Sequence, residues 1–167
     1  MTTSTETKVA TQVYRVYIKA TPETVWEAIT SPEWTQRYGY YSPVEYDLRP
    51  GGAYRGLASA AMIEMGSPEV VIDGEVIEAD PPRKLVQTWR PLWDPEIVAE
   101  GHTRVTWDVE EDDGGLTRLT VTHELEGAPK TAATVAGQGR VTEGGGGWSW
   151  ILSDLKTLLE TGKPLEI

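Results

Sequence analysis

The chain has 167 residues, of which 39% are hydrophobic and 25% are charged, with a formal net charge of −11 and a pI near 4.6. This length suits one domain with a real core. The acidity argues against nucleic acid or an anionic membrane as partner, because both require a cationic protein surface. The absence of cysteine excludes disulfides, thiolate metal sites and a cysteine nucleophile.

The composition and the terminal sequence point to a cytoplasmic protein. No apolar run approaches the ~20 residues of a membrane-spanning helix, and the amino terminus MTTSTETKVATQ lacks the layout of a signal peptide. Phenylalanine is absent, while tryptophan and tyrosine number seven each, so every large aromatic side chain carries a polar group. This suits a ligand cavity and an ordinary core equally.

The first part of the chain predicts a strand followed by two short helices. Residues 1–8 are polar, and we expect them to be disordered. Between residues 9 and 20, alternation places Tyr14, Val16 and Ile18 on one face of a half-buried strand. Thr21 and Pro22 then have the residue types of a helix cap and a first helical position.

The apolar residues of this first helix are Val25, Trp26 and Ile29. A second short helix is expected from Ser31 and should carry Trp34 and Tyr38.

The middle of the chain predicts strands separated by turns. The expected strands cover 44–48, 53–63, 70–79, 85–90, 102–110 and 116–125, with EDDGG at 111–115 joining the last two as a hairpin. We expect 91–101 to be irregular. For 127–140 the pattern is weak, and both a short mobile helix and a lid-like loop remain open.

The clearest helix is at the carboxyl terminus, in WSWILSDLKTLLETG. Its apolar residues recur at helical spacing: Trp148, Ile151, Leu152, Leu155, Leu158 and Leu159. Glycine disfavours a helix interior, so the helix should start near Gly147, after the run that begins at Gly144. Gly162 has the residue type of a left-handed cap, and Pro164 prevents continuation. Consecutive strands with a segregated long helix predict an antiparallel α+β domain.

Five segments resemble a known family: VYRVYIKATPETVWEAITSPE, YDLRPGGAY, GEVIEADPPRKLVQTW, TRLTVTHE and GGWSWILSDLKTLLE. They are similar to the activator of heat shock protein 90 ATPase homologue family, within the START-like or Bet v 1-like (SRPBCC) superfamily. The resemblance implies a helix-grip fold, in which a curved sheet of six or seven strands wraps the carboxyl-terminal helix around a cavity. It places a single domain at 9–162 and a tail at 163–167. The superfamily contains lipid carriers, hormone receptors, polyketide cyclases and a co-chaperone domain, so fold alone leaves the function open.

In a helix-grip fold, inward strand positions and one flank of the helix line the cavity. The candidate ligand-binding residues are Tyr14, Tyr54, Gln87, Trp89, Trp107, His123, Trp148 and Leu152. Each also has a purely structural interpretation. His123 can be a hydrogen-bonded core histidine or a group for ligand contact or proton transfer, and Trp89 and Trp107 can simply pack.

Two other motifs are ambiguous. Asp47, Arg49, Gly51 and Gly52 are best explained structurally, with Arg49 paired to a carboxylate and the glycines permitting positive φ. The glycine run 144–147 is either a flexible hinge or an opening to the cavity, and it lacks the lysine and Ser/Thr of a phosphate loop.

The sequence contains few motifs that are typical of enzymes. His102 and His123 have no metal-binding spacing, no nucleophile elbow is present, and we assign no catalytic residue, metal or cofactor. The leading hypothesis is binding of a small hydrophobic or aromatic ligand without catalysis. The alternatives are a cyclase or aromatase type of enzyme using His123, and a chaperone-ATPase activator, which a lone domain does not favour. A homodimer is compatible with all three.

Overall fold

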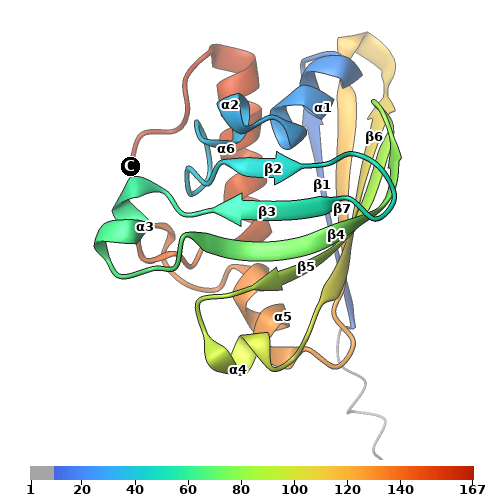
Figure 1. Cartoon of the computed structure of the whole chain (residues 1–167). Coiled ribbons are helices and arrows are strands. Elements are labelled where there is room, and N and C mark those ends of the chain that lie inside the picture. The colour runs from blue at the N-terminus through green and yellow to red at the C-terminus, as the bar shows by residue number, and fades with distance from the viewer. Residues whose placement is uncertain (1–9) are drawn as a thin grey trace, which may run out of the picture.

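The fold is organised around one antiparallel sheet, which the computed structural model describes together with the rest of residues 10–167. Its seven strands have the order β1-β7-β6-β5-β4-β3-β2, and the sheet curves strongly from one edge to the other (Figure 1). The strands are β1 (Thr11–Ile18), β2 (Val44–Tyr46), β3 (Ala53–Leu57), β4 (Val70–Asp80), β5 (Lys84–Pro91), β6 (Thr103–Glu111) and β7 (Thr117–Glu124). The expected disorder of residues 1–8 lies outside the described residues.

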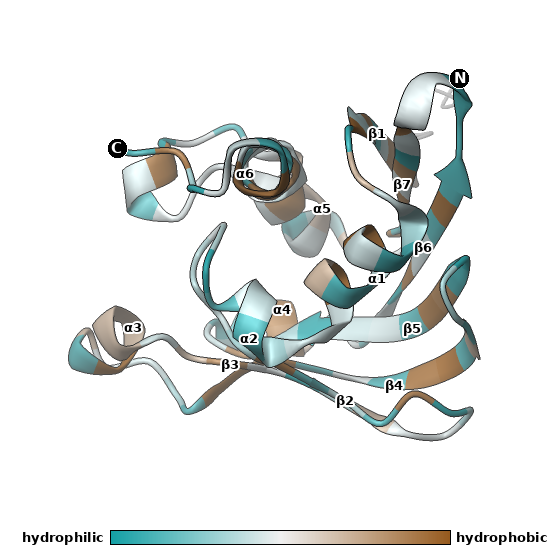
Figure 2. Cartoon of the chain, turned by 90° about the horizontal axis from the view of Figure 1, so that it is seen from above, coloured by the Kyte–Doolittle hydropathy of each residue, from teal (hydrophilic) through white to brown (hydrophobic). Residues whose placement is uncertain are grey.

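The long carboxyl-terminal helix α6 (Gly147–Thr161) lies on the concave side of this sheet, as seen along its axis in Figure 2. Two helices, α1 (Pro22–Thr30) and α2 (Pro32–Thr35), lie at one end of the sheet, and α4 (Pro95–Val98) and α5 (Pro129–Ala136) lie at the other. A short helix, α3 (Ala60–Glu64), projects from the end of β3. This is the predicted helix-grip α+β fold.

Local chemistry explains the helix boundaries. The Thr21 hydroxyl accepts a hydrogen bond from the Thr24 backbone N–H at 3.2 Å, and Pro22 opens α1. At the other end of the chain, Gly162 adopts the left-handed conformation and its N–H reaches the Leu158 carbonyl at 2.8 Å. Both ends were predicted and are confirmed.

The prediction of a continuous strand over 53–63 is wrong after Leu57. The Ser59 hydroxyl accepts from the Met62 backbone N–H at 3.2 Å and so caps α3. Its sequence AAMIE contains good helix formers, and this local preference ends the strand. Similarly, α2 stops at Thr35, so Tyr38 lies in the following loop rather than on the helix.

Two segments without a clear pattern contain helices. In 91–101 the Asp94 carboxylate accepts from the Glu96 N–H at 2.9 Å and caps α4. In 127–140 the ambiguous segment forms α5. Its first N–H groups, at Lys130 and Thr131, donate to the Glu100 carboxylate at 2.7 and 2.9 Å. A capping side chain 30 residues away is invisible to a local pattern.

The motif around Arg49 is structural, but its two glycines are needed for different reasons. Arg49 pairs with Asp47 at 2.8 Å, and Gly51 has a φ of +86°, both as expected. Positive φ is not found at Gly52, where a Cβ would instead lie 2.0 Å from the Asp47 carbonyl oxygen. Among residues 10–167, no helix is both long and apolar enough to cross a membrane.

Candidate functional site

Four aromatic side chains meet between α6 and the sheet: Trp89 of β5, Trp107 of β6, His123 of β7 and Trp148 of α6. Their ring centroids lie 5.0 to 6.0 Å apart, and several pairs are edge to face. None of the four side chains is more than 8% exposed. The structure brings these four predicted residues together, and their mutual packing fills the space between them.

His123 is held by hydrogen bonds on both ring nitrogens. The Trp148 indole N–H donates to Nδ1 at 3.0 Å, and Nε2 lies 2.7 Å from the Thr103 hydroxyl. An indole is only a donor, so Nδ1 must be the acceptor and the ring proton is on Nε2. Nε2–H then donates to Thr103, whose hydroxyl donates to the Trp89 carbonyl at 3.0 Å.

Burial lowers the pKa of His123 to about 3. Near neutral pH the imidazole is therefore uncharged, and both of its nitrogens are occupied by protein groups. This geometry makes His123 a structural link between α6 and β7. It does not leave a free nitrogen for proton transfer.

Gln87 is buried beside this cluster and bridges two aromatic side chains. Its amide contacts Trp107 Nε1 at 3.2 Å and the Tyr46 hydroxyl at 2.5 Å through the same atom. Because the indole is a donor, this atom is the amide oxygen, and Tyr46 must also donate to it. The Gln87 amide nitrogen has only a 3.4 Å contact with the Thr88 carbonyl.

Tyr46 of β2 and Tyr54 of β3 form a cross-strand stack, with ring centroids 4.7 Å apart. Burial raises the pKa of both hydroxyl groups above the usual value, and the nearby Trp89 N–H lowers that of Tyr54 by a smaller amount. Tyr46 nevertheless keeps part of its surface accessible, whereas Tyr54 is 5% exposed.

The Tyr54 hydroxyl and the Trp89 indole have only each other as polar partners. The Trp89 N–H lies close enough to the Tyr54 oxygen to lower the pKa of that hydroxyl, but the contact does not have the geometry of a well-formed hydrogen bond. Within residues 10–167, no other protein group bonds to either side chain's polar atom. Every side-chain nitrogen or oxygen of these residues that is inaccessible to solvent does have a partner, so both groups keep some accessible surface.

The remaining two candidates lie at the margins. Leu152 of α6 is buried in the core. Tyr14 of β1 is partly buried against the core, and its hydroxyl interacts with Gln12 and lies 3.4 Å from the Val135 carbonyl of α5.

Several further residues beside the aromatic cluster were missed. They are apolar side chains that pack against the core and remain partly accessible: Trp34 of α2, Val44 and Tyr46 of β2, Ile72 of β4 and Ile151 of α6. The alternation of Val44 and Tyr46 in the predicted strand 44–48 was the available signal for two of them. Trp34 and Ile151 depend on how the helices pack, which periodicity does not specify.

The glycine run packs closely and is not an open entrance. The Gly146 N–H donates to the Tyr40 hydroxyl at 2.8 Å, and the Tyr40 hydroxyl donates to the Val141 carbonyl at 3.2 Å. The Gly139 N–H meets the Gly145 carbonyl at 3.0 Å. The run therefore fixes the start of α6 against the segment before β2 and the segment after α5.

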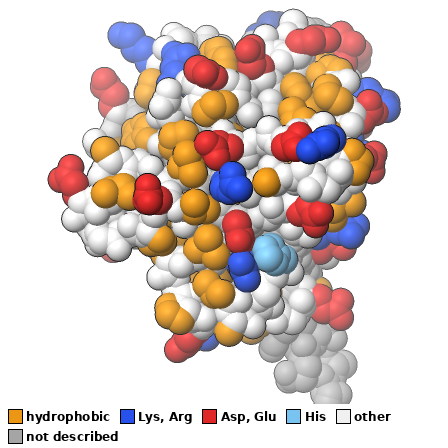
Figure 3. Space-filling model, in the orientation of Figure 1, with side chains coloured by type: hydrophobic (Ala, Val, Ile, Leu, Met, Phe, Trp, Pro, Cys, Tyr) orange, Lys and Arg blue, Asp and Glu red, His pale blue; other side chains and the backbone are white. Residues whose placement is uncertain are grey.

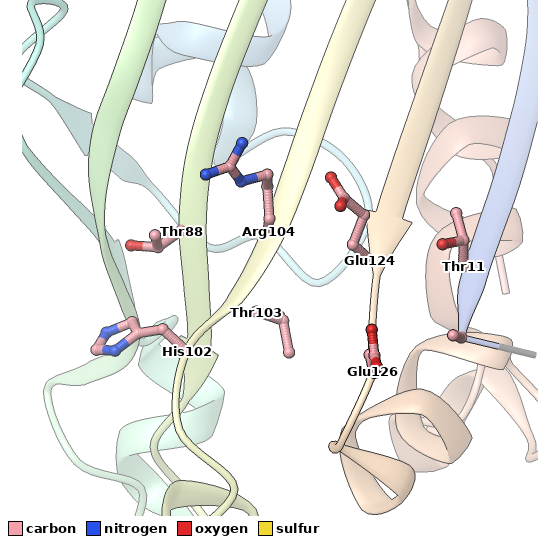
Figure 4. A pocket seen from close by; sticks show the side chains of 8 residues that line it. Thr11, Thr88, His102, Thr103, Arg104, Glu124 and Glu126 are labelled. Carbon is pink, nitrogen blue, oxygen red and sulfur yellow. The ribbon is translucent and has the colours of Figure 1, made fainter. Parts of the chain in front are cut away.

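Two surface grooves lie elsewhere and contain none of the eight candidates. One, of about 350 Å³, crosses the outer face of the sheet, where Thr11, Thr88, Arg104 and Glu124 stand in register on four adjacent strands (Figure 4). The other, of about 730 Å³, lies at one rim and is lined largely by carboxylates such as Glu78 and Asp80. Polar or charged residues make up most of the lining of both grooves, which does not suit a hydrophobic ligand. Figure 3 shows acidic and basic side chains scattered among apolar patches on one face of the molecule.

The comparisons with known proteins agree with this fold. The family model described as "Activator of Hsp90 ATPase homolog 1-like protein" matches residues 19–160. The solution structure of CalU16 from Micromonospora echinospora aligns with a TM-score of 0.63 at 20% identity, covering 93% of this chain and 69% of that chain.

Two further structures show the same fold. DynU16, described as a putative protein in the dynemicin biosynthetic locus, aligns with a TM-score of 0.63 at 22% identity over 93% of this chain. This chain spans 49% of the length of DynU16. It spans 59% of the length of the CalU16 chain in the crystal structure of that protein. PFC0360w, an HSP90 activator from Plasmodium falciparum, has a TM-score of 0.62 at 19% identity, with 90% and 96% of the two chains covered. No curated protein matches the sequence.

Proposed function

The chain belongs to the Activator of Hsp90 ATPase homolog 1-like family, and we propose that it binds a small hydrophobic or aromatic molecule between its sheet and α6. The observation that carries the proposal is a set of apolar side chains that pack against the buried core and stay partly accessible. They are Trp34, Val44, Tyr46, Ile72 and Ile151. Small-molecule sites combine such walls with a few polar groups.

The packed aromatic cluster has a supporting role in this proposal. Trp107, Trp148 and His123 are fixed by hydrogen bonds and edge-to-face contacts, so they form a rigid floor beneath the site. Rigid aromatic walls reduce the entropy that is lost when a ligand binds. The ligand then contacts the stacked Tyr46 and Tyr54 rings and the partly accessible apolar residues directly.

A cyclase or aromatase activity that uses His123 is less well supported. A general base needs a free nitrogen and a pKa near the working pH. His123 has partners on both nitrogens, and burial lowers its pKa to about 3. We therefore propose binding without proton transfer by this residue.

Filling the site from within tests the proposal. Gly56 of β3 faces inward, and a Cβ added there would lie 3.3 Å from the Ile72 Cβ and 3.5 Å from the Tyr54 hydroxyl. Gly56→Val therefore adds volume beside the stack. Ala53→Val is the matched control, because Ala53 is exposed on the same strand.

The measurement is titration of each protein with 2-naphthol and 2-methoxynaphthalene, followed by quenching of tryptophan fluorescence. Native mass spectrometry of freshly purified protein identifies any ligand carried from the cell. We expect saturable binding to the wild type and to Ala53→Val, with at least a tenfold weaker affinity for Gly56→Val. Equal affinity of all three proteins, or no binding to the wild type, would refute the site.

The family description supplies a second candidate, stimulation of an Hsp90 ATPase. It rests on the match over residues 19–160 and has no supporting feature in the candidate site. A steady-state ATPase assay of the cognate chaperone tests it, and an unchanged rate with excess protein would exclude it.

A further inference from the structure

We propose that the ligand of this site is a neutral aromatic molecule with a hydroxyl group, which binds beside Tyr46, Tyr54 and Trp89. The inference rests on the proposed function, because it specifies the chemistry of the molecule that the same site would bind. It is carried by the polar atoms of the stack that the protein leaves unused.

Tyr46 offers only acceptor capacity. Its proton is committed to the Gln87 amide oxygen, because Trp107 fixes the orientation of that amide. No hydrogen bond from residues 10–167 reaches the Tyr46 hydroxyl oxygen. A ligand group that pairs with this oxygen must therefore donate a proton.

Tyr54 offers the complementary donor. Its side chain is 5% exposed, and within the described part of the chain no protein group accepts the proton of its hydroxyl. The Trp89 indole, which is 7% exposed, has only a weak contact with the oxygen of the same hydroxyl. An unused donor of this kind is costly unless water or a ligand accepts from it.

A hydroxyl group satisfies both requirements at once. Its oxygen can accept from the Tyr54 hydroxyl, and its proton can be donated to the Tyr46 oxygen. A ketone or an ether satisfies the donor and leaves Tyr46 unused. The flat Tyr46 and Tyr54 stack beside these atoms favours attachment of the hydroxyl to an aromatic ring.

The surroundings also select against anions. The buried polar residues of the described chain are Thr35, Gln87, Thr103, Thr117, Thr120, His123, Thr131 and Asp154. No lysine or arginine is among them, and His123 is uncharged near neutral pH. A carboxylate ligand such as a fatty acid would lose its hydration without gaining a cationic partner.

Three bicyclic probes of similar shape separate these chemistries: 2-naphthol, its methyl ether 2-methoxynaphthalene, and the anion 2-naphthoate. Each is titrated near neutral pH against the wild type, Tyr46→Phe and Tyr38→Phe. In Tyr46→Phe the Gln87 oxygen keeps its bond from Trp107. Tyr38→Phe is the matched control, because the Tyr38 hydroxyl donates to the Ala28 carbonyl of α1 at 2.9 Å.

We expect the wild type and Tyr38→Phe to bind 2-naphthol about five- to tenfold more tightly than its ether, which is the range for one net hydrogen bond. In Tyr46→Phe this ratio should fall toward one, and 2-naphthoate should bind most weakly throughout. Equal affinities for the three probes, or a preference for 2-naphthoate, would overturn the hydroxyl inference while leaving the proposed function standing. Failure of all three probes to bind would overturn the proposed function itself.

Discussion

The indole N–H of Trp148 on α6 donates a 3.0 Å hydrogen bond to Nδ1 of His123 on β7. This bond joins the long helix to β7, the strand beside the edge strand β1, and fixes the imidazole tautomer. Through Thr103 the chain of hydrogen bonds continues to the Trp89 carbonyl on β5. The helix is thus held to the sheet by a directional polar network as well as by apolar packing.

The burial of His123 predicts a loss of stability in mild acid. Its pKa is about 3 in the folded protein, against 6.5 for a fully solvated histidine, so between these values the unfolded chain binds the extra proton. Stability is therefore full above about pH 6.5 and declines as the pH falls toward 3. From pH 7 to pH 5 the loss should be about 2 kcal/mol, measured by urea denaturation at both pH values.

Two variants isolate the contribution of this residue. His123→Gln removes the titrating group and should reduce the difference between pH 7 and pH 5 to a small remainder. His102→Gln removes a histidine whose side chain is 39% exposed, and it should leave the difference unchanged. The same acid sensitivity in His123→Gln as in the wild type would contradict this assignment.

Removing the indole donor should destabilise the fold at neutral pH. In Trp148→Phe the buried Nδ1 of His123 loses its only donor, at a cost of about 1–3 kcal/mol, with a further loss from reduced packing. Trp93→Phe is the control, because Trp93 is 47% exposed, and its effect should stay within about 0.5 kcal/mol. A similar denaturation midpoint for Trp148→Phe and the wild type would show that this bond contributes nothing.

The extent to which the sequence predicts this protein differs between elements. Strict alternation located β1 and the β6–β7 hairpin, and three-and-four spacing located α6, because one face of each is buried in a single core. The pattern could not show that Asp154 is also buried. Its partners are the backbone N–H groups of Gly39 and Leu165, which lie far from it in the chain or beyond the helix end.

The same limit applies to the candidate site. The inward positions of Gln87, Trp89, Trp107 and His123 follow from alternation, and all four are buried as expected. Which of them pack and which keep unused polar atoms depends on contacts between strands. No spacing in the sequence distinguishes the Trp107 indole, which bonds to Gln87, from the Trp89 indole, which has only a weak contact with Tyr54.

Two glycines of the run, three residues apart, differ in how closely their surroundings pack. Gly144 and Gly147 both have positive φ, at +79° and +63°. A Cβ on Gly144 would have nothing within 4 Å, whereas one on Gly147 would lie 2.3 Å from the Val135 carbonyl oxygen of α5. From the sequence alone, the run could be either a flexible hinge or an opening to the cavity. In the structure the backbone at Gly147 packs closely against α5.

Alanine should therefore be tolerated unequally at these positions. Gly144→Ala should cost about 1–2 kcal/mol, which is the cost of the left-handed conformation. Gly147→Ala adds the steric conflict with α5 and should cost at least about 2 kcal/mol more, since the backbone must move. Thermal and urea denaturation measure both variants, and equal effects would mean that α5 does not pack against the run as described.

Asp154 should anchor the Tyr38–Tyr41 segment to α6. Its carboxylate accepts from the Gly39 N–H at 2.9 Å and from the Leu165 N–H at 2.6 Å, while the Trp150 indole donates to the Gly39 carbonyl at 3.1 Å. In Asp154→Ala the buried Gly39 N–H has no acceptor, at a cost of about 1–3 kcal/mol for a buried donor without a partner. Hydrogen exchange should then become faster at Gly39 than in Ser153→Ala, the exposed neighbour on the same helix turn. Unchanged protection of the Gly39 amide in Asp154→Ala would show that the indole of Trp150 is enough to hold this segment, and that the buried carboxylate is not its anchor.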